Sequence, residues 1–344
     1  MMIDHWIEYF GLEKSVGSFV FLTSLFVLFT TVAYSLFIIV ALFLNAKLAS
    51  RTEARIGVRV GGMFGLFFPV ANLIRSSAKR DITPSLWVHI NFALQMATVS
   101  GIVFTLPLNP YFYPIQSDYG ILVPLLLTLM FFTMRIALMF SASAVEVRLS
   151  AVRTVAMVTA CLAPLTFLVF FLGQELGGYS FQSIINSKQA LGHWTILRGP
   201  LVFLAAFGFV FCSLPMISGL RNETLYFDPL FSKTDVQIYN RLIIEIFEFT
   251  WWIYTAVLFF GGWSIPFVGL GTSFHGDIPI GIGLVLGTAV LMFKGLTFYL
   301  LGSWVRRWVP VARMDQLTDR IWKVGLPLSL ILMIGGLLWK QIQQ

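Results

Sequence analysis

The sequence predicts an all-α polytopic membrane protein with about eight transmembrane helices and one amphipathic helix that lies in the membrane interface. Its 344 residues are 58% hydrophobic and only 11% charged, whereas soluble domains carry roughly 25% charged residues. Apolar runs long enough to cross a hydrocarbon core of ~30 Å, which takes about 20 helical residues, recur along the chain. We therefore expect a single membrane domain over 1–344, and we exclude a soluble enzyme.

The apolar runs define the transmembrane helices in chain order. The stretch before the first run carries three carboxylates and lacks the basic start and small-residue cleavage site of a secretory signal, so the first run is expected to remain in the mature protein. The eight helices are predicted near 17–45, 86–106, 120–141, 151–173, 199–220, 242–263, 279–302 and 321–339.

The connecting segments differ strongly in positive charge. Most of the 23 Lys and Arg residues fall in or beside four of them, predicted as cytoplasmic loops at about 46–85, 142–150, 221–241 and 303–320. The intervening loops hold only Lys188 and Arg198. Because cytoplasmic loops carry the excess of positive charge, both termini are expected on the outer side of the membrane.

The first of these loops contains an amphipathic segment at about 63–80. Apolar residues recur there at helical spacing, and a basic group follows them: Phe64, Phe67, Phe68, Ala71 and Ile74, then Arg75, Lys79 and Arg80. This pattern predicts a helix in the membrane interface. From its own residues, a simple surface anchor is sufficient to explain it.

Four ionisable residues fall inside predicted transmembrane helices, where a charge costs on the order of 3 kcal/mol. Lys294 lies near mid-helix and needs a carboxylate, carbonyl or water partner, so we interpret it as functional. Glu245 and Glu248 share one helix face, where a salt bridge and a functional role are equally open. Arg135 is close enough to its helix end to extend toward the headgroups.

The two cysteines, Cys161 and Cys212, stand alone in predicted helices, so no disulfide, iron–sulfur or metal site is indicated in this chain. Any redox cofactor is expected to belong to a partner. An inverted repeat, which marks many transporters, is not evident in the sequence.

Two segments resemble a known family. The first loop has Lys47, Arg51, Arg55, Gly57 and Gly62, then Gly65-Leu66 and Pro69-Val70-Ala71, before Asp81 and Pro84. The stretch from Val309 to Ile331 reads V-P-V-A-R-M-D-Q-L-T-D-R-I-W-K-V-G-L-P-L-S-L-I. In both stretches the chain is similar to the H subunit of bacterial respiratory complex I, equivalent to mitochondrial NADH dehydrogenase subunit 1. Lys294 and Arg306 also fall at that family's intramembrane lysine and loop arginine.

The resemblance implies a subunit of an NADH-quinone oxidoreductase-like proton translocase in the bacterial inner membrane. Such a subunit forms the membrane floor of the quinone chamber, has no redox centre of its own, docks the peripheral iron–sulfur arm and contacts antiporter-like membrane subunits. The interfacial helix then flanks the quinone entrance. No catalytic or metal-ligating residue is expected in this chain. The implied quinone-chamber and docking residues are Lys47, Arg51, Arg55, Phe227, Asp228, Arg306, Arg313 and Asp315; the implied proton or coupling residues are Arg153, Glu245, Glu248 and Lys294.

The sequence departs from the family at acidic positions. Asn45, Asn72 and Leu162 stand where the family has carboxylates, and Phe227-Asp228-Pro229 is followed by a shortened, less acidic loop. An amide or a leucine cannot carry a proton as a carboxylate does, so proton coupling is expected to be altered or lost. The electron donor is left open between NAD(P)H and ferredoxin. Alternative interpretations are a scaffold subunit of a membrane-bound hydrogenase-type complex and a self-sufficient transporter.

Overall fold

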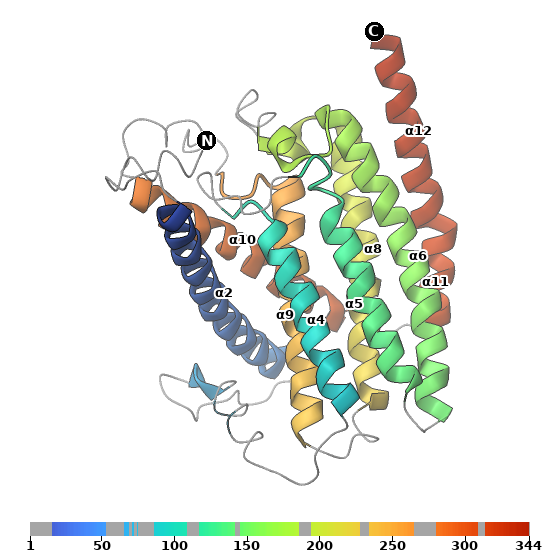
Figure 1. The fold of residues 1–344 in the computed structure, drawn as a ribbon. Helices are drawn as coiled ribbons and strands as arrows, with labels where there is room; N and C mark the ends of the chain where they lie inside the picture. The colour runs from blue at the N-terminus through green and yellow to red at the C-terminus, as the bar shows by residue number, and fades with distance from the viewer. Residues whose placement is uncertain are drawn as a thin grey trace.

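The part of the chain that the structure describes is a bundle of α-helices (Figure 1). This computed structural model describes residues 16–52, 65–68, 71, 74, 86–108, 117–141, 145–185, 194–227, 234–264, 280–308 and 314–343. The helices are α2 (Val16–Thr52), α4 (Leu86–Thr105), α5 (Val123–Phe140), α6 (Val145–Leu176), α8 (Pro200–Phe227), α9 (Thr234–Phe259), α10 (Ile280–Trp308), α11 (Met314–Arg320) and α12 (Leu326–Gln343). A 3-10 turn at Thr195–Leu197 precedes α8, and a π-helical turn at Ile321–Gly325 joins α11 to α12.

Eight of the described helical stretches are long and apolar enough to cross a membrane, which confirms the predicted fold class. Several helices are longer than expected: α2 extends to Thr52, α6 begins at Val145, α8 extends to Phe227 and α10 to Trp308. The hydropathy pattern ends where the hydrocarbon ends, whereas a helix continues through Lys and Arg, which are good helix formers. Parts of the segments predicted as cytoplasmic loops are therefore helical.

The predicted interfacial helix falls largely outside the described residues. Within it the structure describes 65–68, 71 and 74, and Ala71 N donates to Phe67 O at 2.8 Å, the spacing of one α-helical turn. The interfacial helix stays a prediction.

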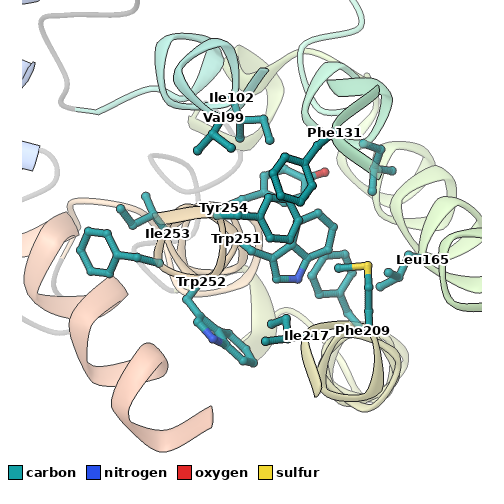
Figure 2. Packing of buried hydrophobic residues seen from close by; sticks show 14 of the residues in the cluster. Val99, Ile102, Phe131, Leu165, Phe209, Ile217, Trp251, Trp252, Ile253 and Tyr254 are labelled. Carbon is teal, nitrogen blue, oxygen red and sulfur yellow. The ribbon is translucent and has the colours of Figure 1, made fainter. Parts of the chain in front are cut away.

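Helix α9 is the most enclosed of the eight spans. Of its most apolar window, 83% of the residues are buried, against 17% for α2. Trp251, Trp252, Ile253 and Tyr254 follow one another on α9 and radiate around the helix toward different neighbours (Figure 2). A helix that is apolar on every side is expected at the centre of a bundle.

Two of the buried aromatic residues on α9 donate hydrogen bonds to other parts of the bundle. Trp251 Nε1 donates to Ser213 Oγ of α8 at 2.9 Å, and Tyr254 Oη donates to the Ile121 carbonyl at 2.7 Å. Trp251 stacks on Phe209 with ring centroids 5.6 Å apart. Because no water is available in the hydrocarbon to satisfy these groups, such bonds fix how α9 is rotated against its neighbours.

The expectation that Arg135 extends toward the headgroups is wrong. Its side chain is only 1% exposed, and Nη1 donates to Asn240 Oδ1 of α9 at 2.7 Å. Arg135 therefore lies in the interface between α5 and α9. An amide on a helix distant in sequence provides the partner, and that proximity cannot be read from the spacing along α5.

Candidate functional site

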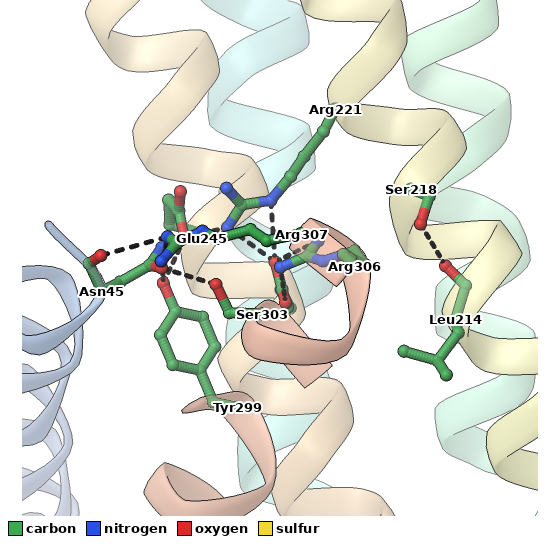
Figure 3. A network of polar contacts seen from close by, with 10 residues as sticks. Asn45, Leu214, Ser218, Arg221, Glu245, Tyr299, Ser303, Arg306 and Arg307 are labelled. Atoms are coloured by element: carbon green, nitrogen blue, oxygen red, sulfur yellow. Dashed lines mark hydrogen bonds and ion pairs between the residues drawn. The ribbon is translucent and has the colours of Figure 1, made fainter. Parts of the chain in front are cut away.

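Three helices bring a group of charged side chains together (Figure 3). Arg221 comes from α8, Glu245 and Glu248 from α9, and Arg306 from α10. We call these four residues the charged cluster. It confirms that Glu245 and Glu248 share a face, because Arg221 Nη2 contacts both carboxylates, at 2.5 and 2.8 Å.

Glu248 is the centre of the charged cluster and is fully buried, with 0% exposure. Arg306 approaches it with two nitrogens, Nη2 to Oε1 at 2.6 Å and Nη1 to Oε2 at 3.1 Å. Arg221 adds Nε and Nη2 to Oε2 at 3.0 and 2.8 Å. A forked guanidinium contact of this kind fixes both the distance and the orientation of the carboxylate.

A chain of hydrogen bonds continues the charged cluster to helix α2 (Figure 3). The Tyr299 hydroxyl donates to Glu245 and accepts from Asn45 Nδ2 at 3.0 Å. Asn45 Oδ1 in turn accepts from Ser303 Oγ at 2.5 Å and from Arg307 Nη2 at 2.7 Å. We call Asn45, Tyr299, Ser303 and Arg307 the Asn45 group.

The two sets of residues together contain three guanidinium groups and two carboxylates. Burying charge is costly unless each charge is paired and hydrogen-bonded. Here every oxygen of Glu248 accepts from a guanidinium. Both carboxylate oxygens of Glu248 therefore have a positively charged donor.

Lys294 lies about 18 Å farther along α10 from Arg306, by the helical rise, in a separate polar site. Its Nζ donates to the carbonyl oxygens of Phe260, Gly262 and Ser264 at 2.8, 2.8 and 2.5 Å. We call these three oxygens the carbonyl site. The Trp194 ring covers it, with its centroid 5.0 Å from Nζ. The expected partner of Lys294 is therefore a set of backbone carbonyls.

The carbonyl site is built by the end of α9. Gly261 and Gly262 have φ of +78° and +56°, and Gly262 N donates to Ala256 O at 3.0 Å. Left-handed glycines after the last helical turn form the usual helix stop and turn the chain back. The turn directs its carbonyls toward α10, where a cation also meets the negative end of the α9 dipole.

The remaining predicted site residues are placed as follows. Lys47 is half-buried on α2, with Nζ 5.6 Å from the Phe43 ring centroid. Arg51 is exposed at the end of α2, and Arg153 is exposed on α6, a helix that gives no side chain to the charged cluster. Phe227 and Asp315 lie on α8 and α11, where the structure describes only their backbone; Arg55, Asp228 and Arg313 lie outside the described residues.

Sequence reasoning missed Arg221 and most of the Asn45 group. In the sequence Arg221 is only one more charge of a predicted cytoplasmic loop, although it belongs to the last described turns of α8. Tyr299, Ser303, Arg306 and Arg307 recur at helical spacing on α10, and a polar stripe in an apolar helix is a readable signal. Asn45 stands out in the sequence only as a missing carboxylate.

Comparisons with known proteins match most of the chain. A family model described as NADH dehydrogenase matches residues 24–218 and 243–336. The H subunit of the NADH-quinone oxidoreductase of Chlorobaculum parvum is 23% identical over 319 residues, covering 85% of each chain. The corresponding H subunit of Anaeromyxobacter dehalogenans is 25% identical over 327 residues, covering 86% of this chain and 76% of that protein. The stretch 219–242, which the family model leaves unmatched, contains Arg221.

Proposed function

Because this chain belongs to the NADH dehydrogenase family, as an H-type membrane subunit of an NADH-quinone oxidoreductase, we propose that it forms the floor of a quinone chamber. In this proposal it docks a peripheral iron–sulfur arm and neighbouring antiporter-like membrane subunits. Electrons come from NAD(P)H or ferredoxin through those partners. The quinone binds at the interface with them, and the chain contributes no flavin, cluster or metal.

The observation that carries the proposal is the charged cluster among predominantly apolar helices. A quinone has two carbonyl oxygens that accept hydrogen bonds and an apolar tail that needs a hydrocarbon path. Arg306 and Arg221 keep 12% and 30% of their side chains exposed beside the buried Glu248. Guanidinium groups held in this way can donate to a quinone carbonyl without losing their carboxylate partner. Lys47, Arg51, Arg55 and Arg313 extend the proposed basic rim for docking.

We further propose that proton entry through this subunit is altered or lost. Asn45 is buried, and its amide fills a position where the family resemblance led us to expect a carboxylate. Leu162 packs against the apolar core. Both oxygens of Glu248 already accept from arginines. A proton path needs groups that can bind and release a proton within reach of one another. Arg153, Glu245, Glu248 and Lys294 remain the predicted coupling residues.

The first experiment is purification of the tagged chain from its native membrane in mild detergent, with mass spectrometry of the proteins that stay bound. Iron–sulfur proteins, antiporter-like subunits and quinone reductase activity are expected. Hydrogenase subunits without quinone reductase activity would favour the scaffold alternative. A folded chain recovered alone would contradict the proposal and favour a transporter.

Proton coupling is tested in proteoliposomes that contain the purified complex. We expect quinone-dependent turnover, with fewer protons moved per electron than in a relative that has carboxylates at the positions of Asn45, Asn72 and Leu162. A ratio equal to that of the relative would contradict the altered-coupling part of the proposal and leave the quinone-chamber part intact.

A further inference from the structure

Lys294 of α10 contacts the turn that ends α9, and Arg306 of α10 contacts α9 itself. They are twelve residues apart, and two of their acceptors, the Phe260 carbonyl just after the end of α9 and the Glu248 carboxylate on α9, are also twelve residues apart. Since α9 and α10 run in opposite directions, equal spacing means that both contacts belong to one register of the helix pair. A shift by one helical turn, about 5.4 Å, would break both.

The packing between the two contacts follows the same register. Gly302 of α10 lies against Trp252 of α9, between the Lys294 and Arg306 contacts along the helix pair. A Cβ at Gly302 would come within 2.6 Å of the Trp252 ring. At Gly295 a Cβ would lie 3.6 Å from the Ile253 backbone, so the two helices approach closely there. Two helices that meet only through apolar surfaces can slide somewhat along each other, whereas the polar contacts of Lys294 and Arg306 do not permit this.

The geometry at Lys294 is complementary to an ammonium group. An ammonium has three N–H donors and no acceptor, and three carbonyl oxygens accept from it. Trp194 covers the site with its ring and donates Nε1 to Ser264 O at 3.2 Å, which holds one of the three carbonyls in place. Among the described residues, every hydrogen bond of Lys294 ends on a backbone carbonyl, and a carbonyl cannot pass on a proton as a carboxylate or histidine does.

We infer that Lys294 is a positioning residue: its ammonium group binds the carbonyl site and fixes the α9–α10 register that brings Arg306 onto Glu248. This role goes beyond the proposed function and differs from that of a proton carrier. It makes the two polar sites energetically dependent on each other, although about 18 Å of helix separates them.

The dependence is measured by a double-variant cycle on the full-length chain. Sites this far apart with no shared partner are normally additive. Cys161 and Cys212 are both buried, so labelling by a thiol-reactive dye during heating reports unfolding. We expect Arg306→Met to lower the unfolding midpoint at least twice as much in the wild-type chain as in a Lys294→Met chain. Equal shifts in both backgrounds would overturn the inference.

A second pair of variants keeps the test decisive if Lys294→Met does not fold. Gly262→Ala strains the positive φ and redirects the carbonyl site while Lys294 itself is unchanged. Gly177→Ala imposes the same kind of strain at φ +76°, after α6 and with open space around it. Gly262→Ala should reduce the effect of Arg306→Met, and Gly177→Ala should not. A reduction by both or by neither would overturn the inference.

Chemical rescue separates positioning from proton transfer. In a Lys294→Ala chain, n-propylammonium should raise the unfolding midpoint, whereas in a Lys323→Ala chain, which loses an exposed pair with Asp319, it should not. No rise in the Lys294→Ala chain would overturn the inference.

In the assembled complex, two amines that are both protonated at the assay pH but differ in basicity should restore turnover equally. Restoration that follows basicity would identify a proton carrier. Absence of quinone reductase activity in the wild-type complex would count against the proposed function and leave the unfolding results valid.

Discussion

Replacement of Arg306 by alanine removes one of the two arginines that contact the buried Glu248 carboxylate. The wild-type Arg306–Glu248 pair is bidentate, with hydrogen bonds of 2.6 and 3.1 Å, and Glu248 is 0% exposed. Breaking a buried ion pair by removing one partner costs roughly 3–5 kcal/mol, because the other charge is left buried. Arg221 still contacts Glu248 at 2.8 Å, so we expect a loss of about 3 kcal/mol, at the lower end of this range.

The assay is chemical unfolding of the full-length chain in mixed micelles, from which the free energy of unfolding is extrapolated. Arg306→Lys retains the charge but cannot make a forked contact. Its free energy of unfolding should therefore lie between those of the wild type and Arg306→Ala. The matched control is Arg153→Ala. Arg153 is exposed on α6, and exposed substitutions usually change stability by less than about 0.5 kcal/mol.

The result that refutes this reasoning is a loss for Arg306→Ala no larger than that for Arg153→Ala. It would mean that Glu248 gains full compensation from Arg221 or water once Arg306 is gone. If the proposed function also holds, quinone-dependent turnover of the complex falls with Arg306→Ala, since the same guanidinium borders the proposed headgroup site. Normal turnover with lowered stability would limit Arg306 to a structural role.

Three further substitutions test the surroundings of the charged cluster. Asn45→Asp places a carboxylate 2.7 Å from Arg307 Nη2, so we expect the free energy of unfolding to change by less than about 1 kcal/mol. The control is Gln95→Glu, at a position that is also buried and is bonded to Asn91, and it should lose several kcal/mol. Similar losses at both positions would contradict pairing by Arg307. Tyr299→Phe removes the hydroxyl that links Glu245 to Asn45 and should cost about 1–3 kcal/mol; a loss as large in an Asn45→Ala background would show that the link contributes nothing. Gly302→Ala adds a methyl group 2.6 Å from the Trp252 ring and should cost about 1–3 kcal/mol by overpacking, whereas Gly335→Ala on α12, with no neighbour within 4 Å, should be neutral or stabilising in the same unfolding assay.

The sequence predicts the fold well because a hydrocarbon environment imposes a simple rule. Each span needs about 20 apolar residues in one helix, and eight such stretches are present among the described helices. Helix ends were predicted less well. The ends of α2 and α8 continue through polar residues, and hydropathy reports only the thickness of the apolar layer.

The candidate site was predictable where burial of charge signals it. Lys294, Glu245 and Glu248 stood out because a charge inside a membrane helix needs a partner. Their partners did not stand out. Backbone carbonyls exist at every residue, so the carbonyl site of Lys294 depends on the turn at Gly261 and Gly262. Arg221 reaches Glu248 only because α8 packs beside α9, and that proximity is a property of the tertiary structure.

The matched polar contacts along α9 and α10 also bear on how the protein enters the bilayer. A central Lys or Asp costs about 2.5–3.5 kcal/mol when a helix partitions alone from the translocon, and α9 and α10 each carry charged residues inside their spans. Lys294 and Glu248 find partners across this pair of helices. Membrane insertion of α9 and α10 as one helical hairpin therefore avoids costs that either helix would meet in isolation. Arg221 of α8 already offers α9 one partner for Glu248, and the synthesis of α10 adds Arg306 as the second.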